Sequence, residues 1–347
     1  MVKVALIGAG KMGISHLSIL GAHPNVEMVG VCDTSKIVTD FLSRYSKFKC
    51  YADYKKMVEE VSPDAVIVAV PTKFHYDIIK YLTKKKLNVF AEKPFCLNSI
   101  QGEELVSLAT SQRIINQVGY HNKFIGTFSE VKRLVKAGVI GNISHFEAES
   151  HGPVVVKATQ SSWRSDPSEG GGCLMDYASH VIDLVNDIIA PITSTEGSVL
   201  KSIYSNKVED SVYSLLKTSN DVTGVLSVDW SDETYRKMST SITIIGTKGK
   251  IISDANELKV YLKDSEGFEC YSKGWNIKYI TDLTKQVDFN LRGEEYSAQI
   301  DYFIDAVSGK KPNSINTFES AWNTDKAIEL IKTSSNKKTY GKNSFWR

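Results

Sequence analysis

The sequence predicts an α/β protein with two domains: a parallel sheet in residues 1–122, then a large, mostly antiparallel open sheet in residues 123–347. Three observations support this prediction. The chain has 347 residues, and domains typically hold about 100–200 residues each. Short apolar runs alternate with helical patterns over the first third, which is typical of parallel sheets. Segments that alternate apolar and polar residues follow, which indicates antiparallel strands with one buried face.

Composition narrows the class of protein. The chain has 42 Lys and Arg against 40 Asp and Glu, a net charge of +2, so it lacks the excess positive charge of a nucleic-acid or membrane-surface binder. Apolar runs such as Ala65–Val70 are far shorter than the ~18–20 residues of a membrane span. No signal-peptide pattern precedes the first strand, so we expect a cytoplasmic protein. The five cysteines form no C-x-x-C pair, which disfavours a zinc ribbon or a disulfide framework.

A glycine pattern follows the first predicted strand, Val2–Ile7, and opens a helix: Gly8-Ala9-Gly10-Lys11-Met12-Gly13. In such a pattern Gly8 permits a tight turn, Gly10 lets the backbone approach a pyrophosphate, and Gly13 lets the helix pack closely. The start of the helix, from Lys11 and Met12 onward, offers free N–H groups to the phosphates. The pattern therefore predicts a dinucleotide site.

An acidic residue supports the same prediction. The second predicted strand, Val26–Cys32, ends at Asp33, twenty positions after Gly13. A carboxylate at this distance hydrogen-bonds the ribose hydroxyls of the adenosine. It also repels a 2′-phosphate, so we predict a Rossmann domain that binds NAD. Ser35 and Lys36 leave NADP as the alternative.

The strand and helix rhythm continues through three more predicted strands, Ala65–Val70, Asn88–Ala91 and Ile114–Val118, with helices at Tyr54–Val61, Tyr76–Lys84 and Ser99–Ser111. Ligands of such sheets lie outside the carboxyl ends of the strands. We therefore predict that the crevice is lined by the residues that follow these strands: Pro71, Thr72, His75, Glu92, Lys93, Tyr120 and Asn122. Pro94 favours an extended Lys93, which we expect to point at the cofactor.

Later segments fit the second domain. A helix is predicted at Phe124–Lys136, and alternating strands at 209–218, 226–230, 241–245 and 258–262. Apolar stripes at helical spacing predict two C-terminal helices, Tyr296–Val307 and Phe318–Ile331. These helices can also pack back on the first domain.

A second group of chemically capable residues lies in the middle of the chain: Trp163, Arg164, Gly170-Gly171-Gly172, Asp176, His180 and Asp183. Asp176 and His180 stand at i and i+4, so they share one face of a helix. A carboxylate beside an imidazole can orient it and support its charged form, which suits acid–base chemistry. A purely structural pair is the alternative. A metal site with Asp183 is disfavoured, because no second histidine lies nearby, and we predict no metal.

Together these residues resemble the glucose–fructose oxidoreductase and inositol dehydrogenase family, Gfo/Idh/MocA. The matching elements are the glycine pattern, Asp33, Glu92-Lys93-Pro94, Trp163-Arg164, and the segment from Gly170 to His180. The resemblance implies a substrate site and an oligomer interface on the open sheet, and hence a homodimer or homotetramer. It implies a pyranose or cyclitol substrate, with Lys93, Asp176 and His180 as the catalytic set. It also implies that Trp163 and Arg164 line the nicotinamide end.

Two segments depart from the family pattern. Lys123 stands where relatives often carry Arg, and the stretch His151–Ser162 has no assignable pattern. Both border the expected substrate pocket, so the resemblance leaves the substrate open.

We predict an NAD(P)-dependent oxidoreductase that transfers hydride between nicotinamide and a sugar or polyol, with His180 as base, Asp176 holding the imidazole, and Lys93 on the reacting oxygen. The alternatives are an NAD-dependent glycosidase of the same fold and a non-catalytic NAD(P)-binding sensor. The cations of Tyr235-Arg236-Lys237 could meet the phosphate of a nucleotide-linked sugar, with Tyr235 and Arg236 binding substrate. The alternative for these residues is an ordinary surface loop.

Overall fold

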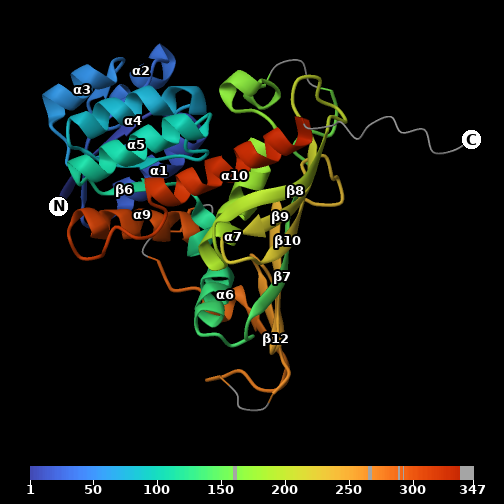
Figure 1. Ribbon diagram of the computed structural model, residues 1–347. Coiled ribbons are helices and arrows are strands. Elements are labelled where there is room, and N and C mark those ends of the chain that lie inside the picture. Colours follow the sequence, from blue (N-terminus) through green and yellow to red (C-terminus); the bar gives the residue numbers. More distant parts are fainter. Residues whose placement is uncertain (159–161, 265–267, 288–289, 292, 337–347) are drawn as a thin grey trace, which may run out of the picture.

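The computed structural model describes residues 1–158, 162–264, 268–287, 290–291 and 293–336. It contains two sheets, a six-stranded and an eight-stranded one, which lie apart with helices between them (Figure 1). The long helix α10 runs from one sheet to the other. Among the described residues, no helix is both long and apolar enough to cross a membrane.

The first sheet has the strand order β3-β2-β1-β4-β5-β6, and all its neighbouring strands are parallel. The order reverses between β1 and β4, which is where Rossmann folds bind their dinucleotide. The parallel sheet predicted from the sequence is thus confirmed. Its strands are β1 (Val2–Ile7), β2 (Val26–Cys32), β3 (Cys50–Tyr51), β4 (Ala65–Val68), β5 (Asn88–Ala91) and β6 (Asn116–Val118). Its helices are α1 (Lys11–Ala22), α2 (Lys36–Tyr45), α3 (Tyr54–Val61), α4 (His75–Lys84) and α5 (Ser99–Gln112).

Several boundaries differ from the predicted ones. The structure adds one strand, β3, and one helix, α2, that were not predicted. β3 has only two residues, too few to show an alternating pattern. β6 begins two residues later than predicted, because the Ile114 N–H caps α5 at the Ala109 carbonyl and the Ile115 N–H donates to the Asn88 side chain. Both amides are thus used outside the sheet.

The second sheet has the order β14-β13-β12-β11-β7-β10-β9-β8. Only the pair β7 and β10 is parallel among the pairs that the structure describes, so the predicted mostly antiparallel sheet is confirmed. Its strands are β7 (Ile143–His151), β8 (Ile192–Lys201), β9 (Ser211–Thr218), β10 (Thr223–Asp229), β11 (Ser239–Gly246), β12 (Gly249–Asp254), β13 (Glu257–Leu262) and β14 (Gly274–Tyr279).

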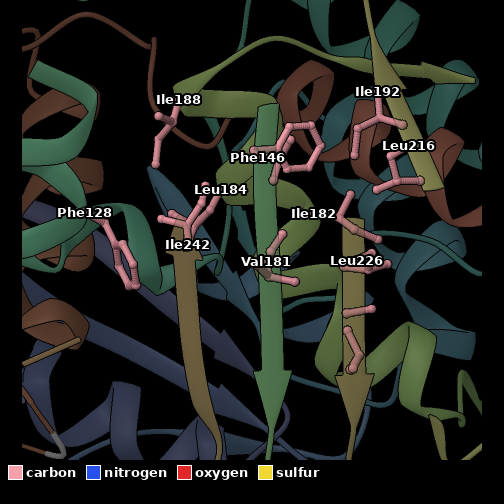
Figure 2. Close-up of a cluster of buried hydrophobic side chains, with 14 of the residues drawn as sticks. Phe128, Phe146, Val181, Ile182, Leu184, Ile188, Ile192, Leu216, Leu226 and Ile242 are labelled. Carbon is pink, nitrogen blue, oxygen red and sulfur yellow. The ribbon is translucent and has the colours of Figure 1, made fainter. Parts of the chain in front are cut away.

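One face of this sheet is covered by two helices, α6 (Gly126–Lys136) and α7 (Ser179–Ile188). Figure 2 shows the core between these two helices and the sheet. Helix residues meet strand residues there: Phe128, Val181, Ile182, Leu184 and Ile188 against Phe146, Leu216, Leu226 and Ile242. Burying each such side chain stabilises the fold by about 1.5–3 kcal/mol. This packing fixes α7, which carries His180.

The two C-terminal helices pack against the first sheet. α9 (Glu294–Val307) buries Ile300, Phe303 and Ile304 with residues of β1 and α1. α10 (Phe318–Asn336) places the Phe318 ring 4.7 Å from that of Phe95 and continues along α7 and β8. The division at residue 122 stays a prediction, because the end of the chain returns to the first sheet.

Candidate active site

The glycine loop has the close packing and the open space that a pyrophosphate requires. Gly8 has φ +91°, and a Cβ there would lie 2.4 Å from the Ala69 carbonyl oxygen. A Cβ on Gly13 would lie 1.9 Å from the Gly8 carbonyl oxygen, whereas one on Gly10 would meet no protein atom within 4 Å. No side chain caps α1, which begins at Lys11, so its first N–H groups are free for phosphates. The loop therefore fits NAD.

Asp33 lies at the end of β2, as predicted, beside this loop. Its Oδ2 accepts a hydrogen bond from the Ala9 N–H at 2.7 Å, and its Oδ1 accepts one from the Ser35 N–H at 2.7 Å. Each carboxylate oxygen can accept a further bond. Asp33 thus holds the glycine loop and keeps acceptor capacity for ribose hydroxyls.

Two residues predicted to bind the cofactor are used inside the protein instead. His75 is fully buried, and its ring nitrogens face the carbonyls of Val70 at 2.9 Å and Phe95 at 3.2 Å. It therefore connects the loop after β4 to the loop after β5. Glu92 is buried against His16 of α1, at 2.6 Å. Burial raises the pKa of Glu92, but the hydrogen bond and charge of His16 outweigh it and lower that pKa.

The loop after β4 meets a segment of the second part of the chain. Pro71 precedes a 3₁₀ turn, Thr72–Phe74, and a Cβ on Gly170 would lie 3.1 Å from Thr72. Lys73 and Glu169 form an ion pair at 2.5 Å. This contact brings the segment that carries Trp163 and Arg164 to the carboxyl end of the parallel sheet.

Lys93, Asp176 and Arg164 form an ion cluster between the two sheets. Lys93 Nζ donates to Asp176 Oδ1 at 2.7 Å and to its carbonyl at 3.0 Å. Arg164 Nε donates to Asp176 Oδ2 at 2.9 Å, and its guanidinium lies 4.5 Å from the centre of the Trp163 ring. Burial raises the pKa of Asp176, but the two cations outweigh it and hold that pKa below its usual value. Asp176 is therefore ionised.

The predicted pairing of Asp176 with His180 is wrong. Asp176 lies in a π-helical turn, Leu174–Ala178, and His180 follows in α7. In the wider π turn, residues four apart no longer stack as in an α-helix. The hydrogen bonds of the Asp176 carboxylate go to Lys93 and Arg164, and His180 Nδ1 is buried with no hydrogen-bond partner in the described structure. Burial, then the charges of Lys93 and His121, lower the pKa of His180 well below its usual value.

Two aromatic rings pack against His180, and a third packs behind one of them. The Tyr120 ring lies 6.1 Å from the imidazole, edge to face, and the His121 ring lies 5.0 Å from it. His121 in turn stacks on Tyr296 of α9 at 4.6 Å. Neighbouring Asn122 is buried, and its amide nitrogen has no partner in the part of the chain described. Tyr120 and His180, both predicted to bind substrate, thus lie together, and Asn122 lies in the same turn as His121. No role was predicted for His121 or Tyr296, because neither belongs to a motif.

A second buried ion pair involves Asp183, which lies one turn after His180 in α7. Lys123 Nζ is 2.9 Å from Asp183 Oδ1, and the side chains are 2% and 0% exposed. Burial raises the pKa of Asp183 to about 7 despite the opposing effect of Lys123. Asp183, weighed above as a metal ligand, is therefore held by Lys123. Within the described residues no group of three His, Cys, Asp or Glu side chains could hold a metal ion.

The loop between β10 and β11 carries Tyr235 and Arg236. The Tyr235 ring lies 5.7 Å from that of His151, and Arg236 is exposed. The charge of Lys237 acts on the carboxylate of Glu295 in α9. Glu295 precedes Tyr296, which stacks on His121, so the loop approaches this side of the site. In the unassigned stretch 151–162, the amides of Val154 and Val155 donate to the carbonyl of Trp230, the residue that follows β10. Residues 159–161 lie outside the described structure.

Known proteins show the same combination of domains. A model of an oxidoreductase family with an NAD-binding Rossmann fold matches residues 2–120, and a model of the GFO/IDH/MocA C-terminal domain matches residues 128–252. The scyllo-inositol 2-dehydrogenase (NAD(+)) of Bacillus subtilis is 23% identical over 344 residues, 96% of this chain and 94% of that protein.

Solved structures share the fold. Levoglucosan dehydrogenase in complex with NADH and levoglucosan aligns with a TM-score of 0.86 at 18% identity, over 97% of both chains. The WlbA dehydrogenase of Bordetella pertussis, in complex with NADH and UDP-GlcNAcA, aligns with a TM-score of 0.82 at 18% identity, over 97% of this chain and 96% of that one. With both of its domains matched, the chain belongs to the GFO/IDH/MocA family of oxidoreductases, whose Rossmann domain binds NAD.

Proposed function

We propose that this protein is an NAD-dependent dehydrogenase that oxidises a hydroxyl of a sugar or polyol, or reduces the matching carbonyl. One observation carries the proposal: Lys93, held by Asp176 at the carboxyl end of the parallel sheet, lies close enough to His180 of α7 for its charge to act on the imidazole. An oxidisable hydroxyl needs a proton acceptor and a cation at the same oxygen, and this arrangement offers both.

The residues divide the chemistry in the oxidative direction as follows. NAD, when bound, supplies the hydride acceptor. His180 accepts the hydroxyl proton at Nε2, since its lowered pKa keeps the imidazole neutral near pH 7. Lys93 donates a hydrogen bond to the same oxygen and stabilises the negative charge that develops there. Ionised Asp176 holds the Lys93 ammonium in place. Trp163 and Arg164, which reach the parallel sheet, line the nicotinamide end.

The relatives support a cyclitol or pyranose substrate. Their names and ligands include scyllo-inositol, levoglucosan and a UDP-linked sugar, all ring compounds with several hydroxyls. A nucleotide-linked sugar is the second candidate, and the Tyr235-Arg236-Lys237 loop favours it. Its two cations lie on the segment that approaches α9 beside the site, where they could meet a diphosphate.

A panel of substrates tests the proposal. Purified protein and NAD are mixed with free cyclitols, pyranoses, and UDP- and GDP-sugars, and NADH formation is followed at 340 nm. The proposal predicts NADH formation with at least one member, and the nucleotide-sugar variant predicts a preference for the linked forms. Release of aglycone from a chromogenic glycoside without net NADH would instead support a glycosidase. Tight NADH binding with no turnover across the panel would support a sensor.

We also propose that the chain forms a homodimer or homotetramer through the outer face of the eight-stranded sheet. Large apolar side chains stand exposed there on β9 and β14: Tyr213, Leu215, Trp275, Ile277 and Tyr279, each 42–55% exposed. Exposed apolar surface of this kind typically marks an interface. Light scattering on wild type and on Leu215→Lys/Ile277→Lys tests this: the variant should be a monomer, and a wild-type monomer would refute the proposal.

A further inference from the structure

His180 lacks the support that a catalytic imidazole normally has. A histidine that acts as a base at one nitrogen needs its proton fixed on the other, and a hydrogen bond there usually sets both tautomer and orientation. Here Nδ1 is buried without a hydrogen-bond partner in the described structure. Of the carboxylates close in sequence, Asp176 is held by Lys93 and Arg164, and Asp183 is held by Lys123. Something else must hold the ring.

Contacts between aromatic rings can hold the His180 imidazole in the described structure. The His121 ring packs against His180 at 5.0 Å with an interplanar angle of 67°. Tyr296 closes the far side of His121, stacked at 4.6 Å and 21°. His121 lies in the 3₁₀ turn His121–Phe124 after β6, and Tyr296 lies in α9, which is anchored in the core of the parallel sheet by Ile300 and Phe303. Both rings are therefore backed by fixed elements.

We propose that His121, backed by Tyr296, is a positioning residue for His180, and that this stack of rings replaces the carboxylate hydrogen bond that the imidazole lacks. The inference rests on the proposed function, because it takes His180 as the base. Edge contacts between rings hold a defined geometry and are worth about 0.5–1.5 kcal/mol beyond their buried area. A misplacement of about 1 Å at a reacting group can cost a hundredfold in rate.

The electrostatic surroundings sharpen the expected effect. The titratable groups near His180 include Lys93 after β5, Tyr120, His121 and Lys123 after β6, Asp176 in the π-helical turn before α7, Asp183 and Asp187 in α7 itself, and Glu295 and Tyr296 on α9. After burial, Lys93 and His121 are the groups that lower the pKa of His180. Removing the His121 side chain makes His180 less buried and removes a charge beside it, so the pKa of His180 should rise.

Two substitutions at His121 separate positioning from other roles. His121→Ala removes the ring, and His121→Phe keeps a ring of similar shape without a titratable group. His145→Ala is the matched control, because His145 is a histidine on the outer face of β7 that touches none of these rings. For each protein we measure the His180 imidazole titration by NMR in the full chain, the kcat and KM of the panel substrate, and the dissociation constant of NADH.

The inference predicts a rise in the pKa of His180 in His121→Ala, because burial and a neighbouring charge are both reduced, and a fall in kcat of about tenfold to a hundredfold. NADH affinity should be unchanged. His121→Phe should restore most of kcat, and His145→Ala should match wild type in every measurement.

Two results would overturn the inference. One is a His180 titration that is identical in His121→Ala and wild type. The other is a His121→Phe variant as slow as His121→Ala with a raised KM, which would mean that the imidazole itself contacts substrate. If no panel substrate is turned over by wild type, the proposed function fails, but the NMR titration still decides whether His121 positions His180.

Discussion

Two lysine–aspartate pairs join the ends of parallel strands to the same helical segment, and they behave differently. Lys93 follows β5 and meets Asp176; Lys123 follows β6 and meets Asp183 seven residues later. The distances are alike, 2.7 and 2.9 Å. Yet the pKa of Asp176 is held below its usual value, whereas burial raises that of Asp183 to about 7.

The difference lies in burial and in the number of cations. Asp176 faces two cations, Lys93 and Arg164, and Lys93 is 16% exposed. Asp183 has a single close cation, and that pair is almost fully enclosed. Desolvation of a buried pair can exceed the attraction between its charges. One pair therefore keeps a charged lysine available at the crevice, and the other connects α7 to the parallel sheet.

The largest expected effect is the loss of turnover when His180, which lies near the Lys93–Asp176 pair, is replaced. His180→Ala should lower kcat/KM by about 10²–10⁴, the range for loss of a positioned acid–base group. NADH affinity should change little, because the glycine loop and Asp33 lie elsewhere. Steady-state kinetics beside a fluorescence titration of NADH measures both. Equal losses in turnover and NADH affinity would mean that His180 shapes the cofactor site instead.

The Lys123–Asp183 pair should contribute to the free energy of unfolding. Lys123→Met leaves the Asp183 carboxyl without its cation, and removing one partner of a buried pair costs about 3–5 kcal/mol. Urea unfolding at pH 8 measures the loss. The double variant Lys123→Met/Asp183→Leu replaces the pair with apolar groups and should recover most of it. A single variant as stable as wild type would contradict the structural role.

The raised pKa of Asp183 also predicts how stability depends on pH. Its folded pKa of about 7 lies above the unfolded value of about 3.9, so the folded protein binds the extra proton between these values. The contribution to the unfolding free energy is therefore fully present below pH 4 and is lost as the pH rises to about 7. Asp183→Asn should flatten the stability profile between pH 4.5 and 7.5. Parallel profiles for wild type and variant would refute this.

A smaller effect is expected at the cofactor loop. A Cβ on Gly10 meets no protein atom within 4 Å, so Gly10→Ala should leave the melting temperature unchanged while it crowds the pyrophosphate. We expect NADH affinity to fall about tenfold, which is about 1.4 kcal/mol. Gly21→Ala is the matched control, since Gly21 lies near the other end of the helix that Gly10 precedes, and a Cβ there would also meet no protein atom within 4 Å. Unchanged affinity in Gly10→Ala would place the pyrophosphate elsewhere.

The sequence predicted what rests on local pattern. The parallel strands, the glycine loop, Asp33 and the strand-end position of Lys93 follow from apolar runs and from spacing. The partner of Asp176 did not, because a π-helical turn changes which residues face each other, and no composition signal marks it. Glu92 and His75 were expected at the cofactor, but contacts with His16 and with two backbone carbonyls enclose them. Such partners are set by tertiary packing, as is the stack of His121 on Tyr296.

Paired measurements on the two lysines separate the catalytic ion pair from the structural one. Lys93→Met and Lys123→Met remove the same charge from pairs of the same kind. We expect Lys93→Met to lose turnover at least a hundredfold, while its NADH affinity and melting temperature stay near wild type. Lys123→Met should lose melting temperature, while the protein that remains folded turns over at a near wild-type rate. A Lys93→Met enzyme with wild-type turnover would mean that Lys93 does not act on the reacting oxygen.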